Sequence, residues 1–144
     1  METEHQQQNK EREGVMPIQL LCHLFGDYVL QSAWMANNKT KRWFPAIVHA
    51  LVYLLPFILV LHPSVAAAVV MAGTHAVIDR YRLARYIAFA KEYLSVKTEW
   101  KVWADCSGTG YYKETPPWLA TWLMIIVDNT LHLTINALAL TYLM

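Results

Sequence analysis

The stretch from Trp43 to Leu61 reads WFPAIVHALVYLLPFILVL and decides the fold class. His49 is its only histidine, and it contains no lysine, arginine, aspartate or glutamate. About 20 consecutive apolar residues cross the hydrocarbon core of a bilayer as a helix. The sequence therefore predicts a membrane-spanning helix over 43–61, and we interpret the rest of the chain around it.

Three further apolar segments flank this stretch, and together they predict an all-α, integral membrane four-helix bundle. The expected spans are 15–36, 65–79 and 118–143. The third span in chain order is short, and we expect it to continue as an amphipathic, cytoplasmic helix to residue 94. Ser64 follows a His-Pro break and is expected to cap that helix.

The polar segments divide the chain into a tail and one membrane domain. Residues 1–14 are predicted to be a polar tail, and residues 15–144 a single membrane domain. Within that domain, residues 95–117 form a polar, aromatic-rich loop on the cytoplasmic side, which could cover a site as a lid.

Composition supports the membrane interpretation and excludes other classes. Of the 144 residues, 56% are hydrophobic and only 16% charged, against about 25% charged in ordinary soluble domains. The net charge is +1 and no basic stripe is present, so we expect no nucleic-acid partner. The lipid bilayer is the predicted environment, and the sequence is compatible with a homo-oligomer.

The placement of lysine and arginine predicts the orientation. Ten of the 12 fall in residues 37–42 and 80–117, on one side of a four-span bundle. The positive-inside rule places this side in the cytoplasm and both termini outside it. We therefore predict a multi-pass protein of a bacterial inner membrane.

The ionisable residues inside the spans follow a single spacing. Each of three aspartates lies four residues from a histidine, which puts both on one helix face. The second span adds one histidine. The seven candidate metal ligands are His23, Asp27, His49, His75, Asp79, Asp128 and His132.

Chain direction brings these seven residues to one depth. Spans one and three run toward the cytoplasm and span four runs away, so the reversed order Asp128-His132 still places aspartate nearer the cytoplasm. Three ionised aspartates cost about 8–10 kcal/mol to insert into a membrane. Hydrogen bonds between polar side chains of neighbouring helices (polar glue) contribute about 1 kcal/mol per pair and do not offset this cost. Polar glue, a proton relay and bis-histidine haem binding remain the alternatives to a metal.

Four histidines and three carboxylates exceed the needs of one tetrahedral ion and favour two divalent transition-metal ions. Imidazole with carboxylate suits zinc, manganese or iron. Gln31 and Arg82 extend the same face toward the cytoplasm and are candidate substrate contacts. Gln19 and Asn136, each one turn deeper than a histidine, could orient the imidazoles.

Four motifs resemble a family of small phage and bacterial membrane proteins described, from a giant tailed phage, only as a domain of unknown function. They are HLFGDYVLQ from His23, THAVIDRY from Thr74, ETPPW from Glu114 and DNTLH from Asp128. The resemblance covers about residues 16–143 and implies a phage or prophage-like origin. A looser similarity, in histidines and aspartates spaced across short membrane helices, is to inner-membrane metal-dependent hydrolases linked to the LexA repressor.

These observations lead to two functional hypotheses. The first is a membrane-embedded, dinuclear, metal-dependent hydrolase at the cytoplasmic face, with a metal-bound water as nucleophile and a lipid or another phosphoester as substrate. The second is a non-enzymatic phage or prophage membrane factor with a structural metal site. Such a factor could be an exclusion or interaction protein, or a metal or proton conduit.

Overall fold

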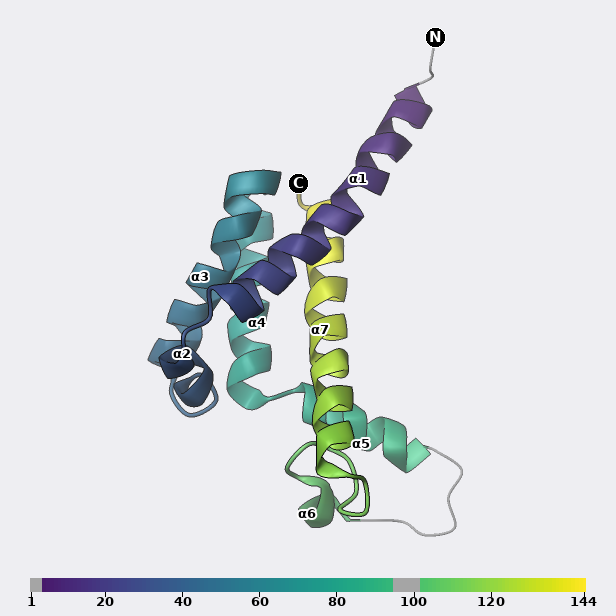
Figure 1. The fold of residues 1–144 in the computed structure, drawn as a ribbon. Helices are drawn as coiled ribbons and strands as arrows, with labels where there is room; N and C mark the ends of the chain where they lie inside the picture. The colour runs from purple at the N-terminus through teal and green to yellow at the C-terminus, as the bar shows by residue number, and fades with distance from the viewer. Residues whose placement is uncertain (1–3, 95–101) are drawn as a thin grey trace.

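The computed structural model describes residues 4–94 and 102–144, and this part of the chain is helical with no strand (Figure 1). The all-α class predicted from the sequence is confirmed. Residues 95–101 of the predicted loop lie outside the described residues.

Four long helices form a ring. They are α1 (Glu4–Leu24), α3 (Trp43–Leu61), α4 (Val65–Tyr81) and α7 (Pro117–Tyr142). Helix α3 packs against α1 and α4, and α7 packs against the same two helices from the other side. The centre of the ring is therefore lined by residues from all four helices.

Short elements gather at one end of this ring. Helices α2 (Ala33–Asn38), α5 (Ala84–Leu94) and α6 (Trp103–Cys106) lie there, while the start of α1 and the C-terminus lie at the opposite end (Figure 1). We call the end that carries the short helices the loop end. Helix α1 begins at Glu4, so the polar segment 1–14 is helical from residue 4 onward.

The predicted continuous span over 15–36 is wrong. After Leu24 the chain forms the π-helical turn η1 (Phe25–Val29), in which the Leu30 N–H donates to the Phe25 carbonyl at 3.0 Å. The chain then bends, and Ser32 accepts a hydrogen bond from Met35 N at 3.3 Å to start α2. A side chain that caps a new helix stabilises the break that hydropathy alone does not reveal.

The predicted continuation of the third span to residue 94 is also wrong. Helix α4 ends because Arg82 adopts a left-handed conformation with φ of 52°, and α5 starts in a new direction at Ala84. The cap at the other end of α4 is confirmed, since Ser64 Oγ accepts from Ala67 N at 3.1 Å. Helix α3 has the predicted bounds.

Among the described residues, two helices are long and apolar enough to cross a membrane, α3 and α7. This is weak support for membrane association, because a buried helix of a soluble protein passes the same test. Helix α4 has only 17 residues, and the four-span arrangement is not confirmed.

The interior of the ring changes character along its length. Near the termini it is an apolar cluster that includes Phe57, Met71 and Leu140. Toward the loop end the buried side chains are polar: Gln19, His23, Asp27, His49, His75, Asp79, His132 and Asn136. The fold thus holds most of the candidate ligands in one buried layer.

Candidate metal centre

Four side chains from three elements bring their donor atoms together in this layer. They are Asp27 of η1, His49 of α3, and His75 and Asp79 of α4, and each is 7% exposed or less. We call them the four-donor cluster. The Nε2 atom of His49 lies 3.0 Å from Asp27 Oδ1 and 3.3 Å from Asp79 Oδ2. The Nε2 atom of His75 lies 3.3 Å and 3.2 Å from the same two oxygens.

These spacings match the edges of a metal coordination shell. A tetrahedral ion with bonds of about 2.0 Å separates its ligand atoms by about 3.3 Å. The two imidazole nitrogens are 3.0 Å apart, and the four imidazole–carboxylate distances span 3.0–3.3 Å. Asp27, His49 and His75 thus form a buried group whose ligand atoms lie close enough together to hold one divalent ion, and Asp79 lies beside the two imidazoles.

The π-helical turn explains how Asp27 reaches the cluster. An extra residue in the turn shifts the angular position of the residues that follow it, and such turns are frequent at functional sites. Gly26 lets this turn lie against α3, because a Cβ at that position would lie 2.8 Å from the Tyr53 carbonyl oxygen. The close approach of backbones places the Asp27 carboxylate beside His49.

His23 takes a different role from the one its spacing to Asp27 predicts. Its Nε2 donates to Asn129 Oδ1 at 2.8 Å, and its Nδ1 accepts from the Tyr53 hydroxyl at 2.9 Å. The distance from Nε2 to Asp27 Oδ2 is 3.6 Å. Both ring nitrogens are thus engaged outside the four-donor cluster.

Asn136 and Gln19 act elsewhere than on the imidazoles. The Asn136 amide donates to the Tyr53 hydroxyl, so it orients His23 through Tyr53. Gln19 Nε2 donates to the Leu133 carbonyl at 2.7 Å. The Tyr53 ring stacks on His75 with centroids 3.8 Å apart, and this packing holds the imidazole in place.

His132 and Asp128 of α7 form the edge of the centre. His132 Nε2 lies 3.8 Å from Asp79 Oδ1 and 3.6 Å from Asp128 Oδ2, and within the described residues it forms no hydrogen bond. His75, Asp79 and His132 make a second buried group whose ligand atoms could hold an ion. Asp128 is further out, with 29% of its side chain exposed.

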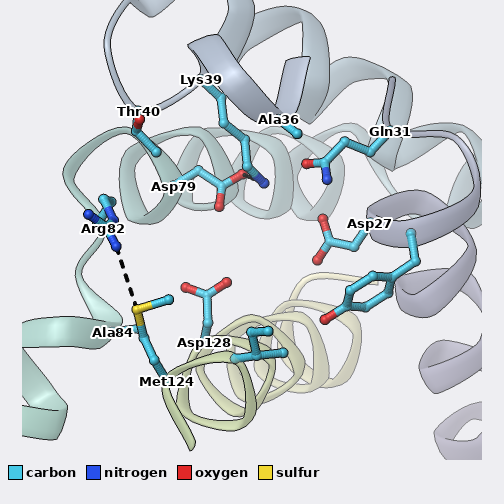
Figure 2. Close-up of a pocket in the computed structure, with 12 residues that line it drawn as sticks. Asp27, Gln31, Ala36, Lys39, Thr40, Asp79, Arg82, Ala84, Met124 and Asp128 are labelled. Atoms are coloured by element: carbon cyan, nitrogen blue, oxygen red, sulfur yellow. Dashed lines mark hydrogen bonds and ion pairs between the residues drawn. The ribbon is translucent and has the colours of Figure 1, made fainter. Parts of the chain in front are cut away.

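A cavity of about 410 Å³ opens beside the four-donor cluster at the loop end. Figure 2 shows the carboxylates of Asp27, Asp79 and Asp128 pointing into it from three sides. Gln31 and Arg82, the residues singled out as substrate contacts, both line this cavity. Arg82 is held by a hydrogen bond of 2.8 Å from its guanidinium to the Gly108 carbonyl.

Lys39 is the site residue that sequence reasoning missed. Its ammonium lies 2.8 Å from Asp79 Oδ2 and 3.2 Å from His49 Nε2, with 16% of the side chain exposed (Figure 2). It follows α2 in the turn 37–42, where its charge predicts only orientation. Lys39 directly follows α2, a helix of six residues that is too short to show a hydrophobic periodicity. The sequence therefore gives no sign that this segment turns Lys39 toward the site.

The comparisons with known proteins place the chain in a family without a known activity. The chain belongs to the DUF3307 family, described as a protein of unknown function, whose model matches residues 15–144. Neither the curated proteins nor the solved structures contain a match. The predicted phage origin and the similarity to LexA-linked hydrolases stay predictions.

Proposed function

We propose that this protein is a membrane-embedded, metal-dependent hydrolase whose four-donor cluster holds a divalent ion. The observation that carries this proposal is the crowding at His49 Nε2. Three other ligand atoms lie within 3.3 Å of it, and an imidazole nitrogen has at most one proton to share among them. A divalent cation satisfies all four donors at once and neutralises the two buried carboxylates.

The donor types suit zinc, manganese or iron. The position of Asp79 between two groups of ligand atoms favours a second ion. One carboxylate oxygen of Asp79 belongs to the four-donor cluster, and the other faces His132. Carboxylates that bridge two ions are typical of dinuclear hydrolases. Asp79, His132 and the outer Asp128 are the ligands we assign to the second ion.

The cavity makes an enzyme the better interpretation than a structural metal. A structural site is closed by protein ligands, whereas a catalytic site keeps a position open. Asp27, Asp79 and Asp128 all line the cavity, so water and substrate can approach the ligand groups. An ion there would supply the nucleophile by lowering the pKa of a bound water toward about 7. We propose a lipid or another phosphoester as substrate.

The distribution of polar and apolar residues supports the membrane location. The buried layer contains four histidines and two aspartates, while large apolar side chains cover the outside of the ring. Exposed examples are Leu21 on α1, Leu51 and Leu59 on α3, Val69 on α4, and Ile126 and Leu138 on α7. Water disfavours such an apolar exterior, and lipid favours it. We propose four membrane-inserted helices, with the loop end in the cytoplasm of a bacterial cell.

Elemental analysis of the protein tests the metal site. We expect at least one equivalent of zinc, manganese or iron per chain after detergent purification without chelator. His49→Asn removes a central ligand and should abolish this content. His62→Asn is the matched control, because His62 caps α3 in a left-handed conformation that asparagine tolerates.

Activity is tested on the same preparations. Release of inorganic phosphate from phosphatidic acid in mixed micelles should require metal and be lost in His49→Asn but not in His62→Asn. Absence of metal from the wild-type protein would overturn the proposal. Bound metal without hydrolysis of phosphate mono- or diesters would favour the non-enzymatic membrane factor.

A further inference from the structure

The position of Lys39 is difficult to reconcile with a bound ion. Its ammonium lies 2.8 Å from Asp79 Oδ2 and 3.2 Å from His49 Nε2, two atoms of the four-donor cluster. An ion on those atoms would lie within a few ångströms of the ammonium, where two positive charges repel strongly because little water screens them. The Lys39 ammonium therefore occupies a position that it must leave for a metal ion to bind.

The charges around the cavity show what Lys39 does before the metal arrives. Three carboxylates face the cavity, and Lys39 and Arg82 are its two cations. With neutral imidazoles the lining carries a net charge of −1. Lys39 thus offsets part of the carboxylate repulsion in the metal-free protein. A single divalent ion changes the net charge to +1, and the cavity then attracts an anion.

The surroundings of Lys39 give its side chain a place to go. It extends from the end of α2 on four flexible methylenes, and the cavity wall beside it is formed by Ala36, Thr40 and Gln31. Arg82 lies on the same cavity and is fixed by its bond to the Gly108 carbonyl. Figure 2 shows Lys39 and Arg82 on different sides of the cavity, with the Asp79 carboxylate between them in this view. The cavity that both residues line has a volume of about 410 Å³ and gives the ammonium room to move.

We propose that Lys39 is a displaceable counter-ion that couples metal loading to the binding of a phosphate-type oxyanion. When a divalent ion takes the four-donor cluster, the ammonium moves into the cavity and, with Arg82, binds the anionic group of the ligand. The inference rests on the proposed metal site and adds to it the residue that recognises the ligand. Binding sites for phosphate-type anions commonly use two cationic side chains, because charge-assisted hydrogen bonds are stronger than those between neutral groups.

The test uses Lys39→Met, which keeps the length of the side chain and removes its charge. Its matched control is Lys41→Met in the same turn, because Lys41 is exposed. We expect Lys39→Met to bind Mn²⁺ more tightly than the wild-type protein by at least about tenfold, since a competing cation is gone. The same variant, loaded with Mn²⁺ and freed of excess ion, should bind inorganic phosphate at least about tenfold more weakly.

The opposite signs of these two effects separate the proposal from a merely structural role. A lysine that only stabilises the fold would lower both affinities when replaced. Lys39→Arg keeps the charge and is expected to retain phosphate binding within a few-fold, which tests the role without removing the cation. Lys41→Met should change neither affinity. Calorimetry on the detergent-solubilised chain measures both.

Each outcome decides a separate claim. Failure of the wild-type protein to bind Mn²⁺ would overturn the proposed metal site. Normal Mn²⁺ binding with no change of either affinity in Lys39→Met would overturn the role of Lys39 alone. The source of the oxyanion is decided by competition: phosphatidic acid in micelles displaces inorganic phosphate if the ligand is a lipid headgroup, and fails to displace it if the ligand is a soluble phosphate.

Discussion

The Nε2 atoms of His49 and His75 lie 3.0 Å apart although they come from different helices, α3 and α4. Both nitrogens also lie 3.0–3.3 Å from Asp27 Oδ1 and from Asp79 Oδ2. Each of these nitrogens carries at most one proton, so neither can donate to both carboxylates at once, and neither nitrogen faces water. This pair lies at the centre of the proposed site.

The first prediction concerns the aspartates. Replacing Asp79 by Asn keeps the shape of the side chain and removes a ligand charge, so metal affinity should fall at least about 10–100-fold. Asp27→Asn should have a similar effect, while Asp128→Asn should have a smaller one because this carboxylate is at the exposed edge. Asp105→Asn is the control, since Asp105 pairs with Lys113 away from the cluster. Equal metal content in all four variants would contradict the metal site.

The second prediction concerns the packing of η1 against α3. Gly26→Ala places a methyl group 2.8 Å from the Tyr53 carbonyl oxygen, and overpacking of this kind costs about 1–3 kcal/mol. The melting temperature and the metal content should fall together, because the same contact positions Asp27. Gly73→Ala is the matched helical control, since no atom lies within 4 Å of a Cβ there. A melting temperature equal to that of the wild type in Gly26→Ala would be evidence against the described backbone approach.

The third prediction separates folding from metal binding. Tyr53→Phe removes the hydroxyl that accepts from Asn136 and donates to His23. Leaving these two buried groups unpaired should cost about 1–3 kcal/mol of stability. Metal content should remain unchanged because the stacking on His75 is retained. Tyr142→Phe, at an exposed position, should change neither quantity. Loss of metal from Tyr53→Phe would show that the network, rather than packing, orients the imidazoles.

The fourth prediction tests the membrane location. Leu51 is 57% exposed near the middle of α3, where it would face lipid. Leu51→Lys should reduce insertion, because a lysine at the centre of a membrane helix costs about 2.5–3.5 kcal/mol. Val102→Lys lies outside the long helices and serves as the control. The measurement is the fraction retained in membranes after alkaline extraction. Equal retention of both variants would contradict a lipid-facing α3.

The sequence predicts the parts of the site that depend on regular helical spacing. His75 and Asp79 lie four residues apart on α4 and do converge, and the match in depth between Asp27 and His49 also holds. These predictions succeed because residues four apart share a face of an α-helix. His23 also lies beside Asp27, at 3.6 Å, but both of its ring nitrogens are bonded to Tyr53 and Asn129, partners that the spacing does not predict.

The features that escaped prediction depend on local irregularity. The left-handed Arg82 ends α4 although its residue type carries no signal for that conformation. Lys39 reaches the cluster because the chain bends after η1 and α2 packs against α3, and Ser32 caps the start of α2. A hydropathy pattern averages over such single-residue effects, so it finds the spans of a bundle more readily than the bends between them.

The closure of the ring by α7 has a consequence for the order in which the protein is made. All four donors of the cluster lie within the first 79 residues, whereas α7 begins at Pro117. A chain is synthesised from its N-terminus, so these four residues are made before the helix that packs on α1 and α4. Helix α7, which is made after the other three long helices, then closes the interior and contributes His132. The four donor residues and the helix that closes the interior over them are thus synthesised in succession.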